Sequence, residues 1–221
     1  MRRARCKTSI GALLVAIGQL CPLPAPAADA ANREWHFRVT LDGKAIGDHR
    51  FTLSEEGGMR RMVSEARFRV RILFVDAYRY RHRAEEQWRG ECLERLEAVT
   101  DDDGNESIVQ GEQAGDSFEL KRVAATMKLG ECVQTFAYWN PKILAAQRLL
   151  NPQTGEYVPI QVLAIGPQPL AGYGSANRYR LIGREGGKRL EIDVWYSDDR
   201  DWLALESLTP EGRRLRYARL P

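Results

Sequence analysis

Histidine and cysteine are scarce in this 221-residue chain, which contains three histidines and four cysteines. His36, His49 and His82 are widely spaced and form neither an H-E-x-x-H nor an H-x-H pair, so the sequence predicts no metal site. A P-loop, a G-x-G-x-x-G fingerprint and a G-x-S-x-G nucleophile elbow are also missing. We therefore predict no catalytic residue, no metal and no cofactor, and the sequence favours a protein that is not an enzyme.

Net charge and long apolar runs are missing as well. The chain has 33 basic and 30 acidic residues, and residues 1–27 hold four of the basic residues and no acid. The remainder is close to neutral, which removes the electrostatic support that a nucleic-acid partner requires. No apolar run beyond residue 30 approaches the roughly 20 residues of a membrane-spanning helix. We expect no nucleic-acid partner and no transmembrane segment after the leader.

The first 30 residues have the pattern of a secretory signal peptide. Met1–Lys7 is basic, Ile10–Leu20 is apolar, and small residues in an A-x-A arrangement follow. We predict a signal peptide at 1–27, alternatively 1–30, and a single β-rich domain at 31–221 in the periplasm or outside the cell. Cys21 follows Leu20, where lipoprotein processing requires a small residue, so a lipid anchor is not expected.

Cys92 and Cys132 are the cysteines that remain after removal of the leader. In an oxidising compartment they predict one disulfide, which closes a loop of about 40 residues and stabilises the fold by roughly 3–4 kcal/mol. The alternative is a reactive thiol, but the sequence shows no base beside either cysteine.

Alternation of apolar and polar residues is the dominant pattern in the rest of the chain. It predicts strands near 34–41, 46–55, 62–74 and 78–88, with a tight turn at Asp42-Gly43. One face of each strand is apolar and the other is polar, which is typical of antiparallel sheets. Further strands are expected at 92–100, 107–112, 117–124, 132–138, 157–165, 177–183, 190–196, 203–208 and 215–220.

A helix at about 140–150 is the exception, because Asn140 is a good N-cap and Pro141 fits the first helical position. The fold prediction is therefore mainly β. We expect a single curved antiparallel sheet, or a half-open β-barrel, of about a dozen strands with one short capping helix.

Aromatic residues on the apolar face have two interpretations. They fill the core, or some of them line a hollow that binds a ligand. The residues that we single out as ligand-binding candidates are Tyr78, Tyr80, His82, Trp88 and Trp139. Trp139, beside the expected helix start, is predicted at the mouth of a pocket.

Arginines alternate with these aromatic residues along two successive strands. The rows Arg67, Arg69, Arg71 and Arg79, Arg81, Arg83 predict a basic stripe on the outer face of one hairpin. The stripe is either a solvated surface balanced by Glu65, Glu85 and neighbouring acids, or a contact surface for anionic envelope components.

Four motifs resemble an uncharacterised family of exported bacterial β-rich proteins. They are Phe37–Gly47, Phe136–Pro141, Leu150–Gly155 and Val194–Ser197. This resemblance implies export and a β fold, and it implies no activity. In strand order and length the chain also resembles LolA- and LolB-type lipoprotein carriers, which hold acyl chains in an apolar hollow.

Three functions follow as hypotheses. The leading one is non-enzymatic binding of an apolar or amphiphilic envelope ligand, such as a lipid, in the curved sheet. The alternative is a structural or assembly partner at the envelope that uses the arginine stripe. An envelope-acting enzyme that uses His82 or Asp193 is the third. The identity of the ligand and the oligomeric state are not predicted.

Overall fold

The computed structural model describes the chain apart from residues 1–31, 73–74, 123–124, 210 and 221. The predicted signal peptide and Cys21 lie outside the described residues. Leu73 and Phe74, at the end of the strand expected at 62–74, also lie outside them.

The described residues form fourteen strands and one 3₁₀ helix. Their bounds are β1 Arg33–Leu41, β2 Lys44–Glu56, β3 Met59–Ile72, β4 Val75–Arg89, β5 Cys92–Asp102, β6 Asn105–Ala114, β7 Ser117–Arg122, β8 Ala125–Leu129, η1 Pro141–Ala145, β9 Arg148–Leu150, β10 Tyr157–Leu170, β11 Gly174–Glu185, β12 Lys188–Tyr196, β13 Trp202–Leu208 and β14 Arg214–Arg219. Among the described residues, no helix has the length and apolar character that a membrane crossing requires.

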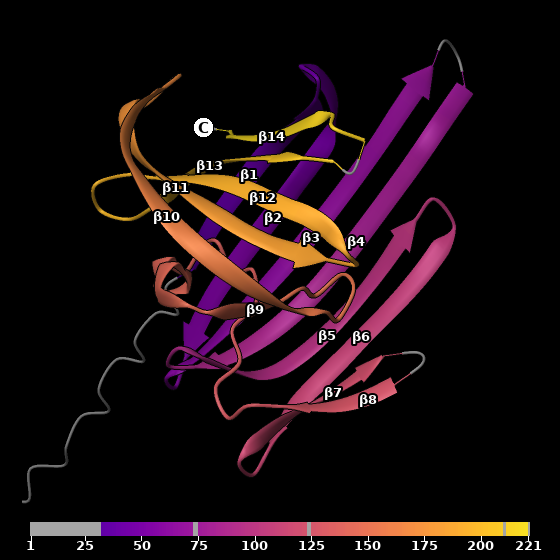
Figure 1. The fold of residues 1–221 in the computed structure, drawn as a ribbon, viewed down its shortest axis with the longest axis vertical. Coiled ribbons are helices and arrows are strands. Elements are labelled where there is room, and N and C mark those ends of the chain that lie inside the picture. The colour runs from indigo at the N-terminus through magenta and orange to yellow at the C-terminus, as the bar shows by residue number, and fades with distance from the viewer. Residues whose placement is uncertain (1–31, 73–74, 123–124, 210, 221) are drawn as a thin grey trace, which may run out of the picture.

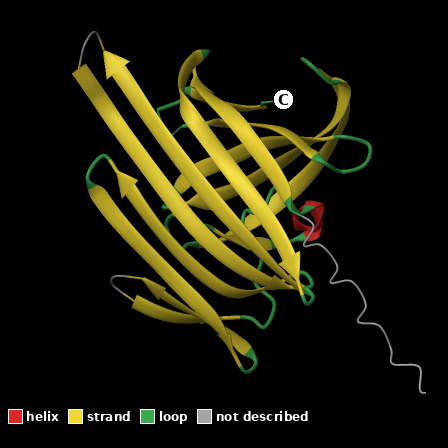
Figure 2. Cartoon of the chain, turned by 180° about the vertical axis from the view of Figure 1, so that it is seen from behind, coloured by secondary structure: helices red, strands yellow, loops and turns green. Residues whose placement is uncertain are grey.

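All the strands belong to one 14-stranded antiparallel sheet, in the order β8-β7-β6-β5-β4-β3-β2-β1-β14-β13-β12-β11-β10-β9. The first and last strands are neighbours inside the sheet, where β1 pairs with β14 from Phe37↔Arg219 to Leu41↔Leu215. β8 and β9 are the two edges, so the sheet is not closed. Figure 1 shows β10 to β13 passing across the long strands β1 to β4, and Figure 2 shows these long strands from behind. The prediction of a single curved antiparallel sheet is confirmed.

The two faces of β3 and β4 follow the alternation of the sequence. Met62, Ala66 and Ala84 are buried on the inner face, whereas Arg67 and Arg81 are exposed on the outer face. The inner face continues into an aromatic cluster around Trp202, whose ring centroid lies 4.3 Å from Phe37 and 4.9 Å from Phe51. Burial of such large apolar surfaces is the main force that holds the curl together.

The segment Cys132–Ala146, which we call the interior segment, fills part of the space inside the curl. Its alternate residues Val133, Ala137 and Trp139 are buried. The Val133 carbonyl accepts a hydrogen bond of 2.9 Å from the Leu93 amide, on the long side of the sheet. The Tyr138 carbonyl accepts one of 2.8 Å from the Tyr196 hydroxyl, on β12. The interior segment therefore connects the two limbs of the sheet.

Two expected elements differ from the structure in this region. The predicted strand at 132–138 has alternate burial, but its pairing is limited to an isolated bridge between Thr135 and Leu150. The predicted helix at 140–150 is a five-residue 3₁₀ helix at Pro141–Ala145, capped by Asn140 as expected. The helix does not extend further because Arg148–Leu150 obtains sheet hydrogen bonds by pairing with β10. A short isolated helix is too weak to compete with that pairing.

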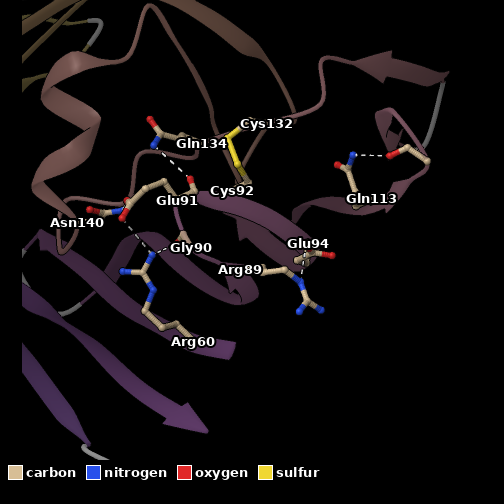
Figure 3. The surroundings of a disulfide bond; sticks show 11 residues. Arg60, Arg89, Gly90, Glu91, Cys92, Glu94, Gln113, Cys132, Gln134 and Asn140 are labelled. Carbon is tan, nitrogen blue, oxygen red and sulfur yellow. Dashed lines mark hydrogen bonds and ion pairs between the residues drawn. A yellow bond between two sulfur atoms is a disulfide. The ribbon is translucent and has the colours of Figure 1, made fainter. Parts of the chain in front are cut away.

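The disulfide between Cys92 and Cys132 is present, with a Cα–Cα distance of 4.8 Å. Figure 3 shows it where β5 begins, beside a polar group that surrounds Glu91. The Glu91 carboxylate accepts a 2.7 Å hydrogen bond from the Asn140 side chain and lies 3.8 Å from the Arg60 guanidinium. The disulfide and these contacts attach the start of the interior segment to the sheet.

Candidate functional site

A band of polar side chains crosses the inner face of the sheet. His49 on β2, Ser64 on β3, His82 on β4 and Thr100 on β5 are all buried. His82 lies opposite Thr100, and Ala66 lies between His49 and His82 in the ladder. Because side chains opposite each other in a sheet share a face, these four polar side chains lie on the same face of four neighbouring strands.

Both histidines form hydrogen bonds with neighbouring hydroxyl groups. The Nε2 atom of His49 lies 2.7 Å from the Ser64 Oγ, and its Nδ1 atom lies 3.4 Å from the Tyr217 hydroxyl. The Nδ1 atom of His82 lies 2.9 Å from the Thr100 Oγ1. The two imidazole centroids are 6.4 Å apart.

Burial keeps both histidines uncharged at neutral pH. Desolvation lowers the pKa of His82 to about 4. It lowers the pKa of His49 well below the ordinary value, and the neighbouring His82 lowers it further. The band is therefore a set of neutral hydrogen-bonding groups at pH 7.

Glu86 is the one carboxyl group deep in this region that the sequence analysis missed. It is buried on β4, opposite Met62 of β3 and Leu96 of β5. The Trp88 indole N–H donates a 2.9 Å hydrogen bond to Glu86 Oε2. Burial nevertheless raises the pKa of Glu86 to about 7. The signal was available, because position 86 has the same parity as Tyr80, His82 and Trp88 on an otherwise apolar face.

A cavity of about 260 Å³ lies between the polar band and the interior segment. Its polar groups include those of His49, Ser64, His82 and Glu86 on the long strands, together with Asn151, Gln153, Glu185 and Ser207. Its aromatic wall comes from both the sheet and the interior segment and consists of Phe51, Phe136, Tyr138, Trp139, Trp202 and Tyr217. An aromatic hollow with a few placed polar groups is the usual form of a small-molecule site.

The ligand-binding candidates from the sequence occupy different places. His82 and Trp139 line the cavity. Trp88 is fully buried behind it and packs edge-to-face on Trp139, with ring centroids 5.7 Å apart. Tyr80 stacks on Phe68 at 5.2 Å, and the Tyr78 hydroxyl donates a 2.6 Å hydrogen bond to Asp102. Tyr78, Tyr80 and Trp88 do not line the cavity, whereas Trp139 lies at its wall. A role in ligand binding stays a prediction for all five candidates.

The arginine stripe lies on the opposite, outer face. Arg67 faces Arg81 and Arg69 faces Arg79 across the β3–β4 ladder. All six arginines, which include Arg71 and Arg83, are exposed. At one end, Arg83 forms a 2.6 Å ion pair with Glu65, as expected for a balanced surface. Whether the stripe contacts a partner stays a prediction.

Hydrolytic chemistry has little support from this geometry. Ser64 and His49 have the spacing of a nucleophile and a base, but Ser64 lies on a strand paired on both sides. Its neighbouring amides are therefore engaged in the sheet, where an oxyanion hole would require free N–H groups. Asp193 is the other residue considered for an enzyme. Its neighbour Ile192 lines the cavity, so Asp193 lies on the opposite face of β12, where its carboxylate forms a 2.8 Å ion pair with Arg180.

No group of three or more histidine, cysteine, aspartate or glutamate side chains among the described residues is placed to hold a metal ion. The disulfide also engages both described cysteines.

Comparisons with known proteins agree with this fold. The family model described as "Domain of unknown function (DUF6134)" matches residues 37–220. No curated protein matches the chain. The chain is also similar to a solved structure, the crystal structure of a beta-barrel-like protein of domain of unknown function DUF1849 from Brucella abortus. The TM-score is 0.63 at 11% sequence identity, and the match covers 86% of this chain and 96% of that chain. At this identity the likeness shows the fold alone, and together the two matches confirm the predicted membership of an uncharacterised β-rich family.

Proposed function

Because the chain belongs to the family of the domain of unknown function DUF6134, whose description carries no activity, we propose a function from its cavity. The protein binds a compact apolar or amphiphilic ligand inside the curled sheet, without transforming it. After export it does so in the periplasm or outside the cell.

The cavity is the observation that carries this proposal. The inner face is not filled completely, and a space of about 260 Å³ remains beside Trp139 and Trp202. Ligand pockets usually measure roughly 300–1,000 Å³. The space therefore suits a small molecule, or one end of a longer amphiphile.

The composition of the wall supports an amphiphile over a purely apolar molecule. Phe51, Trp139 and Trp202 offer apolar surface, whereas Ser64 and Glu86 offer polar groups to the same space. The Trp139 indole N–H is buried without a hydrogen-bond partner among the described residues. An unpaired buried donor is unfavourable by about 1–3 kcal/mol, which a polar atom of a ligand would recover.

Filling the cavity is expected to abolish ligand binding. Ala84 is buried and lines the cavity. We expect Ala84→Phe to weaken binding of the neutral fluorescent probe N-phenyl-1-naphthylamine at least tenfold, because the added ring occupies the ligand's space. Fluorescence titration of the purified protein measures this affinity.

Val99→Phe is the matched control, because Val99 is 46% exposed on β5 and its new ring points away from the cavity. The control should bind like wild type. Ala137→Phe, on the interior segment, repeats the test from the opposite wall should Ala84→Phe fail to fold. Absence of probe binding by wild type, or unchanged binding by both cavity variants, would contradict the proposed function.

A further inference from the structure

The cavity has an unbalanced set of ionisable groups. Two carboxyl groups line it, those of Glu86 and Glu185, and none of the described lining residues is a lysine or an arginine. The two lining histidines, His49 and His82, are held neutral by burial, which lowers the pKa of each. The protein therefore supplies acids to this space without supplying a cation.

Glu86 is the more deeply buried of the two acids. Its neighbours in the ladder are apolar, namely Met62 and Leu96. Glu185 is half-buried, and its Oε1 atom accepts 2.7 Å hydrogen bonds from Asn151 and Thr154. A buried carboxylate without a counter-ion is costly, and a cation brought by a ligand would remove that cost.

Arg60, a cationic side chain beside the cavity wall, already has partners outside the cavity. Arg60 lies over the Trp139 ring, with its guanidinium carbon 4.9 Å from the ring centroid. Its charge pairs with Glu91 at 3.8 Å, and it also donates to the Gly90 carbonyl. Arg60 thus belongs to the polar group near the disulfide, and not to Glu86.

Aromatic rings surround the same space. The Trp202 centroid lies 5.3 Å from Tyr138 and 4.9 Å from Phe51. The faces of tryptophan and tyrosine attract cations, and the attraction grows where water is excluded. A carboxyl group with several aromatic rings is the arrangement that recognises ammonium groups.

We propose that the cavity selects a cationic ligand, an amine or quaternary ammonium group on a short apolar body, with Glu86 as its counter-ion. This inference rests on the proposed function and adds the charge of the ligand to it. Trp139, Trp202 and Tyr138 enclose the cationic group, and the remaining apolar wall holds the body.

The charge state of Glu86 makes the selection depend on pH. The other titratable groups that line the cavity are His49 and His82 from the sheet, Tyr138 and Tyr217 from the aromatic wall, and Glu185 from β11. Burial raises the pKa values of the two tyrosines and lowers those of the two histidines, so these four do not change charge near pH 7. With the pKa of Glu86 at about 7, the affinity for a cation should rise roughly tenfold between pH 6 and pH 8.

Three ligands with the same tail test the inference. Octyltrimethylammonium, octanol and octyl sulfate are titrated against the full chain by isothermal calorimetry, below their micelle concentrations. At pH 8 the wild type should bind the ammonium compound at least tenfold more tightly than octanol, and octyl sulfate most weakly. Glu86→Gln should reduce the preference for ammonium over octanol to about one, whereas Glu106→Gln, at an exposed position on β6, should keep it.

The outcomes separate the inference from the proposed function. Binding of octanol and octyltrimethylammonium with equal affinity would overturn the cation selectivity and leave ligand binding intact. An ammonium preference that survives in Glu86→Gln would overturn the role of Glu86. Absence of binding by all three ligands would contradict both proposals.

Discussion

Relative to Glu86→Gln, the wild-type protein is expected to lose about 3 kcal/mol of folding free energy as the pH rises from 4.5 to 8. Glu86 is buried, and burial raises the pKa of its carboxyl group from the ordinary value of 4.5 to about 7. In the unfolded chain the carboxyl group ionises freely in water. The folded state must either hold the proton or bury the charge.

The sign of this pH dependence of stability follows from the raised pKa of Glu86. Below the unfolded pKa the carboxyl group is neutral in both states, and its full contribution to stability is present. Between pH 4.5 and pH 7 the folded protein retains a proton that the unfolded chain has lost, so stability falls as pH rises. Glutamine has nearly the same shape and cannot ionise, so the variant lacks this loss.

Urea unfolding at several pH values measures the difference between the two proteins. His49 and His82 have lowered pKa values, so their contribution is present above the ordinary histidine pKa and is lost as the medium becomes acidic. Both proteins contain these histidines, and their effect cancels in the difference. If the free energies of unfolding of wild type and Glu86→Gln changed with pH in parallel, the raised pKa of Glu86 would be contradicted.

Removing the disulfide is expected to lower stability by about 4 kcal/mol. Cys92 and Cys132 are 40 residues apart in the sequence, so their bond greatly restricts the unfolded chain. In the folded protein the bond also holds the interior segment beside β5, where the Leu93 amide donates to Val133. The double variant Cys92→Ser/Cys132→Ser should unfold at much lower urea concentration than the oxidised wild type.

Reduced wild type is the matched control for the double variant, since it lacks the bond and keeps both sulfur atoms. The two should unfold at similar urea concentrations. The loosened interior segment should also weaken probe binding, because Ala137 and Trp139 form one wall of the cavity. A stability loss below about 1 kcal/mol would contradict this prediction.

Local patterns predicted the strands well. In β3 and β4 the alternation of arginines with Met62, Ala66 and His82 correctly predicted which face is buried. Position 86 carried the same periodic signal, but a search for apolar positions passes over a glutamate.

Other features depend on contacts between distant parts of the chain, which periodicity does not contain. The pairing of β1 with β14 joins the first and last strands, and no short pattern indicates it. Residues 132–138 alternate like a strand, because one side packs inward, but they lie inside the curl with the single bridge Thr135–Leu150. The cavity depends on where this segment packs, so its lining was predicted only at His82 and Trp139.

The central claim is that the space inside the curl holds a ligand. Native mass spectrometry tests it most directly, on protein expressed with residues 1–31 in place, exported and purified without detergent. The account predicts a second species, heavier by one small amphiphile, that Ala84→Phe lacks and that solvent extraction releases from wild type. A spectrum with empty protein alone, together with a solvent extract free of any such molecule, would contradict it.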